Sequence, residues 1–261
     1  MPFTLSHAAA AWPFRRTRLE FSALLTGCFV PDFPYFLFLI AHGFDGHTIR
    51  GLFFLDLPVG LVALWLFHRW IRRPFSIFLP AGVRSRLKSD GHDFSFLPLP
   101  RLAMIVLSIL IGGATHIAWD EFTHRTLWLY RHWAFLRIPY DYPLVGTQQM
   151  YKLLQYTSTF FGLAFVAFWI WHWYRTTCPV ERPVEAPFTP GQRRALVVIL
   201  PLVATCGGAL RAYFAIEALT NIKSLVLFAG DALVTSISLF GLELLLCGFF
   251  LRWREAATRH A

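Results

Sequence analysis

Long apolar stretches recur along the chain, separated by shorter polar segments. Six of them reach about 18 mostly apolar residues or more, the length at which an α-helix can cross a bilayer. They are Leu19–Ala41, Leu52–Trp70, Leu102–Asp120, Leu153–Tyr174, Ala195–Ala218 and Asp231–Leu251. The pattern predicts an all-α fold, a polytopic membrane helix bundle of about six transmembrane helices. We expect one integral membrane domain over residues 1–261.

Composition strengthens the membrane interpretation. Of 261 residues, 56% are hydrophobic and only 15% are charged, which is more apolar surface than one soluble core of this size can bury. The net charge is +9, but most Lys and Arg lie in segments that a cytoplasmic N-terminus would place inside, such as Arg69–Arg101. This is the positive-inside asymmetry of membrane proteins. We therefore expect membrane lipid as a partner and no nucleic acid.

The third apolar stretch ends in polar residues at helical spacing. His116, Asp120 and His124 are four residues apart, so a helix would place them on one face. Ionisable side chains at membrane depth are costly and are usually functional. This face is the first candidate site.

Other apolar stretches carry polar residues toward the same outer end of the predicted bundle. His47 precedes the second stretch, Asp56 lies within it, Gln155 begins the fourth, and Arg211 lies in the fifth. Asp56 and Arg211 are expected to neutralise each other inside the bundle. Arg211 is alternatively a clamp for a phosphate group, and both roles stay open.

Histidine together with carboxylate is the ligand set of zinc or a similar divalent ion. His116 and Asp120 alone are a weak signal, and Asp32 and His47 strengthen it because a buried carboxylate needs a partner. A hydrogen-bonded polar network without metal remains the alternative.

Aromatic and basic residues are frequent after His124. Trp128, Tyr130, Trp133, Phe135 and Tyr140 lie beside Arg131 and Arg137. An interfacial anchor at the lipid headgroups accounts for this mixture better than a substrate platform does.

Several segments resemble the domain-of-unknown-function 4184 group of bacterial integral membrane proteins. They are Met1–Ala10, Val30-Pro31-Asp32-Phe33, Gly51–Gly60, Thr115–Asp120 and Leu154–Thr159. The resemblance covers roughly residues 1–250, and it implies a bacterial cytoplasmic (inner) membrane location without implying an activity.

A looser likeness concerns chemistry. The order His, Pro-Asp, His, His-x-x-x-Asp is similar to the membrane-bound metal-dependent hydrolases and, more distantly, to zinc-dependent phospholipase C. The matching positions are His7, Asp32, His47, His116 and Asp120, and the likeness implies that Asp120 bridges or orients the metal. The chain lacks a second downstream histidine–glutamate cluster, which puts a full three-metal site in doubt.

Topology bears on the ligand set. If the first stretch crosses from the cytoplasm, His7 lies on the side opposite His116. If Phe3–Trp12 and Leu19–Val30 instead dip into the membrane and return, the N-terminus is outside and five helices cross. The six-helix default supports Asp32, His47, His116 and Asp120 as ligands and leaves His7 provisional.

The leading hypothesis is a metal-dependent hydrolase that contains zinc and acts on an ester or phosphoester at the outer leaflet, including a lipid-linked substrate. Asp120 would orient the metal and Arg211 would stabilise developing negative charge. The rival is a non-enzymatic membrane protein, a small transporter or an interaction protein, whose polar cluster is structural or forms an ion path.

Overall fold

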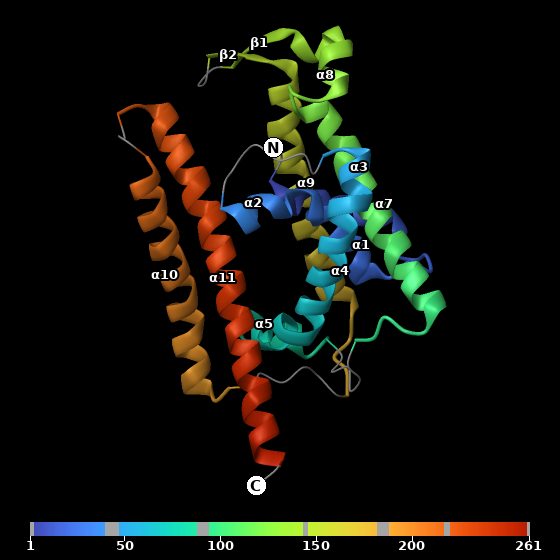
Figure 1. Cartoon of the computed structure of the whole chain (residues 1–261), viewed down its shortest axis with the longest axis vertical. Helices are drawn as coiled ribbons and strands as arrows, with labels where there is room; N and C mark the ends of the chain where they lie inside the picture. The colour runs from blue at the N-terminus through green and yellow to red at the C-terminus, as the bar shows by residue number, and fades with distance from the viewer. Residues whose placement is uncertain are drawn as a thin grey trace. The chain divides into compact units, whose positions relative to one another are not determined.

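The computed structural model describes residues 3–39, 47–87, 94–142, 146–181, 188–216 and 220–259, and most of them are helical (Figure 1). Within these residues six helical segments are long and apolar enough to cross a membrane. They are Phe21–Phe38, Ile49–Phe78, Leu99–His132, Met150–Thr176, Pro190–Ala215 and Ser224–Ala257. The predicted all-α polytopic membrane bundle is thereby confirmed. The predicted span ends Ala41 and Ala218 lie outside the described residues.

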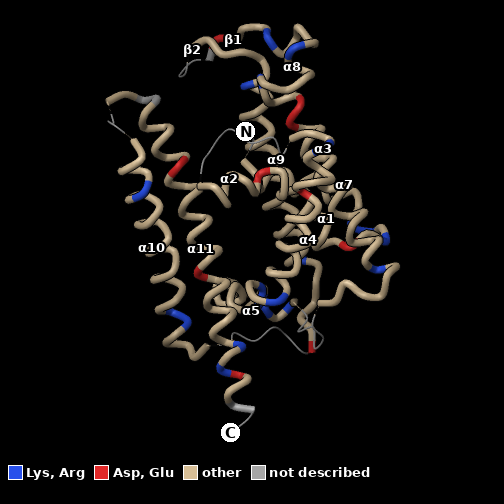
Figure 2. The backbone as a smooth tube through the Cα atoms, viewed as in Figure 1, with Lys and Arg blue, Asp and Glu red and all other residues tan. Residues whose placement is uncertain are grey.

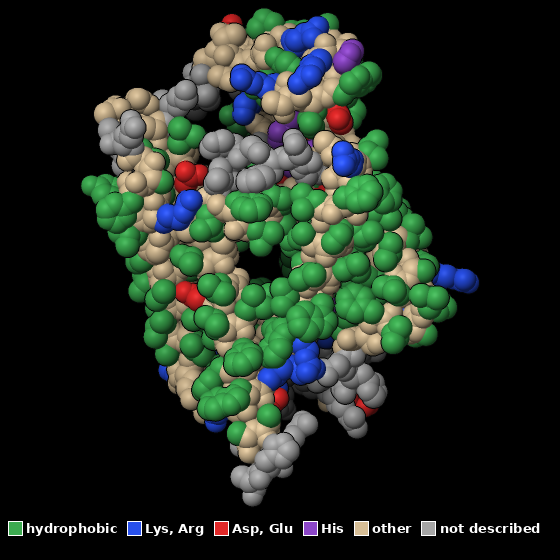
Figure 3. Space-filling view, in the orientation of Figure 1, with side chains coloured by type: hydrophobic (Ala, Val, Ile, Leu, Met, Phe, Trp, Pro, Cys, Tyr) green, Lys and Arg blue, Asp and Glu red, His purple; other side chains and the backbone are tan. Residues whose placement is uncertain are grey.

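The surface of these helices matches a lipid environment. Figure 2 shows that most of their residues are uncharged, and large side chains such as Phe54 and Phe214 are both 78% exposed. Hydrophobic side chains cover much of the face drawn in Figure 3. Since apolar surface of this extent is unfavourable in water, its exposure fits the surface of membrane-spanning helices.

The chain divides into two compact units. The first contains residues 1–33, 45–64 and 96–175, and the second contains residues 34–44, 65–95 and 176–261. This division does not decide whether the chain is one domain, so the single domain stays a prediction.

The first unit is mainly helical and carries one antiparallel two-stranded sheet. Its elements are η1 (Thr4–Phe14), α1 (Phe21–Phe29), η2 (Val30–Asp32), α3 (Ile49–Gly51), η3 (Leu52–Asp56), most of α4 (Leu57–Leu66), α7 (Leu99–Thr123), α8 (Trp128–His132), η6 (Ala134–Arg137), β1 (Pro139–Tyr142), β2 (Gly146–Gln149) and α9 (Met150–Thr176).

Close backbone contact between α1 and α7 forms the core of this unit. A Cβ atom at Gly112 would collide with the backbone of Leu24, and one at Gly27 would collide with the backbone of Ile109. Small residues permit such an approach between membrane helices. This contact aligns the end of α1 with the polar end of α7.

The N-terminal region forms a hairpin against α7 and α9. Along η1, the Phe3 amide donates to Thr159 Oγ1 (3.1 Å) and the Trp12 ring lies 5.0 Å from that of Trp169, so this limb follows α9. Along α1, the Glu20 amide donates to Ser108 Oγ (2.9 Å), so the return limb follows α7. Within the first unit this is the arrangement that the re-entrant alternative requires.

The second unit is built around a pair of long helices. Its elements are α2 (Phe33–Phe38), η4 (Phe67–Ile71), α5 (Arg72–Phe75), η5 (Ser76–Phe78), α6 (Ala81–Arg84), α10 (Pro190–Ala215) and α11 (Ile222–Arg259). Gly208 allows α10 to contact α11 at Ala232 and Ser236. Arg252 Nε donates to the Arg69 carbonyl (2.8 Å), which attaches η4 to α11.

Candidate metal centre

Four side chains from separate parts of the sequence converge in the first unit. Asp32, His47, His116 and Asp120 each offer one ligand atom, and these atoms all lie within 4.8 Å of one another. Asp32, His116 and Asp120 are completely buried, and His47 is 8% exposed. We call these four residues the His/Asp centre.

Local structure explains how the residues reach this point. His116 and Asp120 are one turn apart on α7, as their spacing predicts, and both face the interior. Pro31 lies in the short 3-10 helix η2, which follows α1 directly and ends at Asp32. His47 lies just before α3. The tight α1–α7 contact therefore places Asp32 beside His116.

The donor atoms surround a small space. His47 Nε2 is 2.9 Å from Asp120 Oδ2 and 3.4 Å from Asp32 Oδ1. His116 Nε2 is 3.3 Å from Asp120 Oδ2 and 3.6 Å from Asp32 Oδ1. Two imidazole nitrogens and two carboxylate oxygens thus alternate around one point, and this set of ligands could hold a metal ion.

The orientation of His116 shows that this point requires positive charge. His116 Nδ1 lies 2.7 Å from the Cys28 carbonyl, which only accepts, so Nδ1 carries a hydrogen. In a neutral imidazole, Nε2 then presents a lone pair to two carboxylates. Within the described residues, Asp32 Oδ1, His116 Nε2 and Asp120 Oδ2 make no hydrogen bond. A divalent cation or added protons would satisfy all of them.

His7 lies next to the centre, on the side of the second carboxylate oxygen of Asp120. Its Nε2 lies 3.5 Å from Asp120 Oδ1, and its ring stacks on that of His116 at a centroid distance of 3.8 Å. The hairpin therefore brings the provisional ligand to the predicted place, although His7 is outside the four-residue group. Burial lowers the pKa of His7 to about 4, and the charge on His116 acts in the same direction.

His47 has the opposite electrostatic environment. Burial by itself would lower its pKa, but the nearby carboxylates of Asp120 and Asp32 outweigh burial and raise the pKa to about 9. His47 without metal is therefore an imidazolium at neutral pH, and a metal ion would have to displace this proton.

Hydroxyl groups hold the two carboxylates, and the sequence analysis identified neither hydroxyl group. Thr4 Oγ1 donates to Asp32 Oδ2 at 2.6 Å, and Thr123 Oγ1 donates to Asp120 Oδ1 at 3.3 Å. Thr123 follows Asp120 by three residues and could have been found from helical spacing. Thr4 could not, because its contact exists only through the hairpin.

The remaining predicted residues lie at different distances from the centre. His124 Nδ1 is 3.6 Å from Asp120 Oδ2 and lies 3.2 Å from the Asp120 carbonyl, at the end of α7. Asp56 is buried in the π-helix η3, and neither carboxylate oxygen has a hydrogen-bond partner among the described residues. Gln155 is buried and its Oε1 accepts from Lys152 Nζ (2.7 Å).

Arg211 belongs to the second unit. Its Nη1 donates to Thr235 Oγ1 at 3.3 Å, between α10 and α11. Both predicted roles of Arg211, as a partner of Asp56 and as a phosphate clamp, stay predictions.

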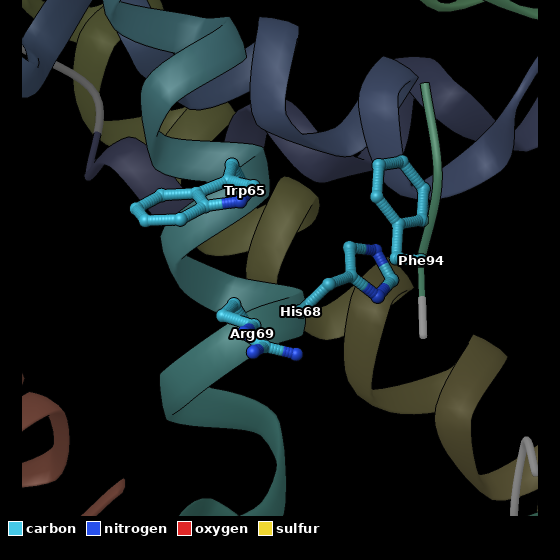
Figure 4. A pocket seen from close by; sticks show the side chains of 4 residues that line it. All are labelled: Trp65, His68, Arg69 and Phe94. Atoms are coloured by element: carbon cyan, nitrogen blue, oxygen red, sulfur yellow. The ribbon is translucent and has the colours of Figure 1, made fainter. Parts of the chain in front are cut away.

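A cavity of about 290 Å³ lies in the second unit and has a different character. Trp65, His68, Arg69 and Phe94 line it (Figure 4). His68 stacks on Phe94 with the ring centroids 4.1 Å apart. Its lining contains one histidine and no carboxylate, so it lacks the ligand set of a metal centre.

The model of the family described as Domain of unknown function (DUF4184) matches residues 1–249. The chain belongs to this family. No curated protein and no solved structure matches it significantly. The matched range includes every residue of the His/Asp centre, so the centre lies within the part of this DUF4184 protein that defines the family.

Proposed function

We propose that this DUF4184 protein is a metal-dependent hydrolase of the bacterial cytoplasmic membrane, acting on an ester or phosphoester presented at the outer leaflet. The convergence of Asp32, His47, His116 and Asp120 on one buried point carries the proposal. Histidine and carboxylate ligands occur in catalytic zinc sites, whereas structural zinc sites are built mainly from cysteine, with or without histidine.

The surrounding residues support a catalytic use of the centre. Asp32, His47, His116 and Asp120 would hold the ion, and Thr4 and the Cys28 carbonyl orient two of these ligands. A bound divalent ion would acidify water and polarise a carbonyl or phosphoryl oxygen. His7, held neutral beside Asp120, offers a further nitrogen at the edge of the centre.

A non-enzymatic membrane protein is the second candidate. The raised pKa of His47 supports this candidate, since a proton on His47 offsets one of the two carboxylate charges without a metal. In that case the cluster is a buried polar network, or a station on an ion path, in a small transporter or interaction protein.

Metal content separates these candidates. We expect purified protein, in detergent and in nanodiscs, to contain close to one equivalent of zinc or another divalent metal by plasma mass spectrometry. The His116→Ala/Asp120→Ala double variant should lose it. His68→Ala is the matched control, because His68 lies in the cavity of the second unit.

A metal-free wild type in both environments would rule out the hydrolase. Retention of metal by the double variant would show that the ion binds elsewhere. If metal is present, hydrolysis of carboxylic ester and phosphoester panels, compared between the wild type and the double variant, tests the enzymatic part.

A further inference from the structure

Two arginine side chains meet at one carbonyl oxygen in the second unit. Arg84 Nη1 donates to the Leu79 carbonyl at 2.6 Å, and Arg193 Nη2 donates to the same oxygen at 2.9 Å. Arg193 Nε also donates to the Ile77 carbonyl at 2.7 Å. Because two donors share one acceptor atom, the two guanidinium groups lie within a few ångströms of each other. We call Arg84 and Arg193 the arginine pair.

The break between η5 and α6 makes this meeting possible. Leu79 follows η5 with an extended backbone (φ −81°, ψ 134°), and the backbone hydrogen bonds of α6 begin only at the Pro80 carbonyl. The Leu79 carbonyl is therefore open to side-chain donors. Arg84 reaches it from the end of α6, and Arg193 reaches it from the first turn of α10.

Backbone carbonyls orient the two guanidinium groups without cancelling their charge. Within the described residues neither arginine forms an ion pair with a carboxylate, and Glu255 in the same unit is bound to Arg73. Burial and the neighbouring charge of Arg193 both lower the pKa of Arg84, as expected for like charges held together. An anion that contacts both groups would remove this repulsion.

The arginine pair keeps donors for such an anion. A guanidinium group has several N–H donors in a planar fork, and the contacts with Ile77 and Leu79 use only some of them. Both arginine side chains are half-buried, so a ligand can reach them from outside. A phosphate group suits this arrangement, because its oxygens accept several charge-assisted hydrogen bonds from arginine at once.

The arginine pair lies where two apolar spans end. Ile49–Phe78 ends directly before Leu79, and Pro190–Ala215 begins in the turn that carries Arg193. Figure 2 marks Lys and Arg at the beginning of α10 in blue. The ends of membrane spans lie at the level of the lipid headgroups. Phospholipid phosphates are therefore at the depth of the arginine pair, and soluble phosphates reach the same depth from water.

We propose that Arg84 and Arg193 form a binding site for a phosphate group, supplied by an anionic phospholipid headgroup or by a soluble phosphate. This site goes beyond the proposed function, since it belongs to the second unit and requires neither a metal ion nor hydrolysis. Bound phosphate would hold the turn between η5 and α6 against the beginning of α10.

Lipid binding is measured on the full-length protein in a maltoside detergent, which carries no phosphate. Phosphatidylglycerol is titrated into the wild type, Arg84→Gln, Arg193→Gln and the double variant, and bound lipid is counted by native mass spectrometry. Each single variant should bind about tenfold more weakly, as expected for loss of one charge-assisted contact, and the double variant should show no saturable binding. Glutamine keeps an amide donor for the Leu79 carbonyl.

Two further variants separate this site from general basic charge and from misfolding. Arg194→Gln is the matched control, because Arg194 is the neighbouring arginine on α10 and its Nε donates to the Pro190 carbonyl (3.5 Å). Arg193→Lys keeps the positive charge and should lose less affinity than Arg193→Gln. Equal affinity in the wild type and the double variant overturns the proposal. An equal loss in Arg194→Gln, or in Arg193→Lys and Arg193→Gln, does so as well.

The source of the phosphate is decided in a second arm. Inorganic phosphate is titrated calorimetrically into the same proteins in the same detergent. Binding of phosphatidylglycerol but not of inorganic phosphate through the pair identifies a lipid headgroup as the ligand, and the reverse result identifies a soluble phosphate. A wild type that binds neither probe overturns the proposal.

Discussion

At the scale of single residues, backbone and hydroxyl groups decide how the centre presents its ligands. The Cys28 carbonyl fixes the His116 tautomer, and Thr4 occupies the second oxygen of Asp32. Each contact leaves one specific atom of the ligand directed at the central point. Outer-shell partners of this kind tune metal affinity even though they never touch the ion.

Thr4→Val should weaken metal binding by about 10- to 100-fold, because Asp32 loses the hydrogen bond that orients it. Chelator competition against the purified protein measures the change. Thr17→Val is the control, since Thr17 Oγ1 donates to the Phe14 carbonyl and accepts from the Leu19 amide, both at exposed positions. Equal affinities in all three proteins would mean that Thr4 has no influence on the site.

The metal-free protein should be most stable near pH 6.5. The pKa of His47 is raised from 6.5 to about 9, so its contribution to stability is complete below pH 6.5 and is lost as the pH rises through 9. The pKa of His7 is lowered from 6.5 to about 4, so its contribution is complete above pH 6.5 and is lost as the pH falls toward 4. Melting temperatures across pH 4–9 measure both limbs.

His47→Gln should flatten the alkaline limb and leave the acid limb in place. An unchanged alkaline limb in this variant would assign the loss of stability to another group.

At the scale of elements, the α1–α7 contact connects fold and site. Gly27 and Gly112 let the two backbones touch, and this places η2 with Asp32 at the level of His116. The hairpin then adds His7 from η1. The centre therefore depends on packing between helices as much as on its own polar residues.

Gly112→Val should destabilise the protein by about 1–3 kcal/mol or more, since its side chain would meet the backbone of Leu24 and overpack the core. It should also lose metal, because Asp32 moves away from His116. Thermal unfolding and metal analysis test this. Gly241→Val is a helical control whose Cβ would meet nothing within 4 Å. Normal metal content in Gly112→Val would show that metal binding does not depend on the α1–α7 contact.

At the scale of the whole molecule, the N-terminal hairpin determines on which side of the membrane the start of the chain lies. The six apolar segments include Phe21–Phe38, but its first part returns along α7 beside η1. Because His7 reaches Asp120, the start of the chain lies at the same end of the first unit as the end of α7.

We expect the N-terminus on the same side of the membrane as α8, opposite the Arg72–Arg101 segment. Reporter fusions at the N-terminus, at residue 131 and at residue 84 measure this. A cytoplasmic N-terminus with an external residue 131 would contradict the hairpin and remove His7 from the site.

Much of this could be predicted from local pattern. Apolar stretches predict the spans because a bilayer demands about 20 apolar residues per crossing. Helical periodicity predicts that His116 and Asp120 share a face, because that spacing is local. Polar residues at membrane depth identify Asp32 and His47 as candidates, because such residues are costly without a function.

Tertiary structure decided the rest. The contact of Thr4 with Asp32 and the return of η1 along α9 join residues that are distant in sequence. Such contacts depend on how closely backbones approach and where the chain reverses, and no periodicity encodes either one. The sequence by itself determined a membrane bundle with a polar end, because hydrophobicity and helix period act over short distances. Only the packing of η1, α1, α7 and α9 decided which polar groups meet at one point.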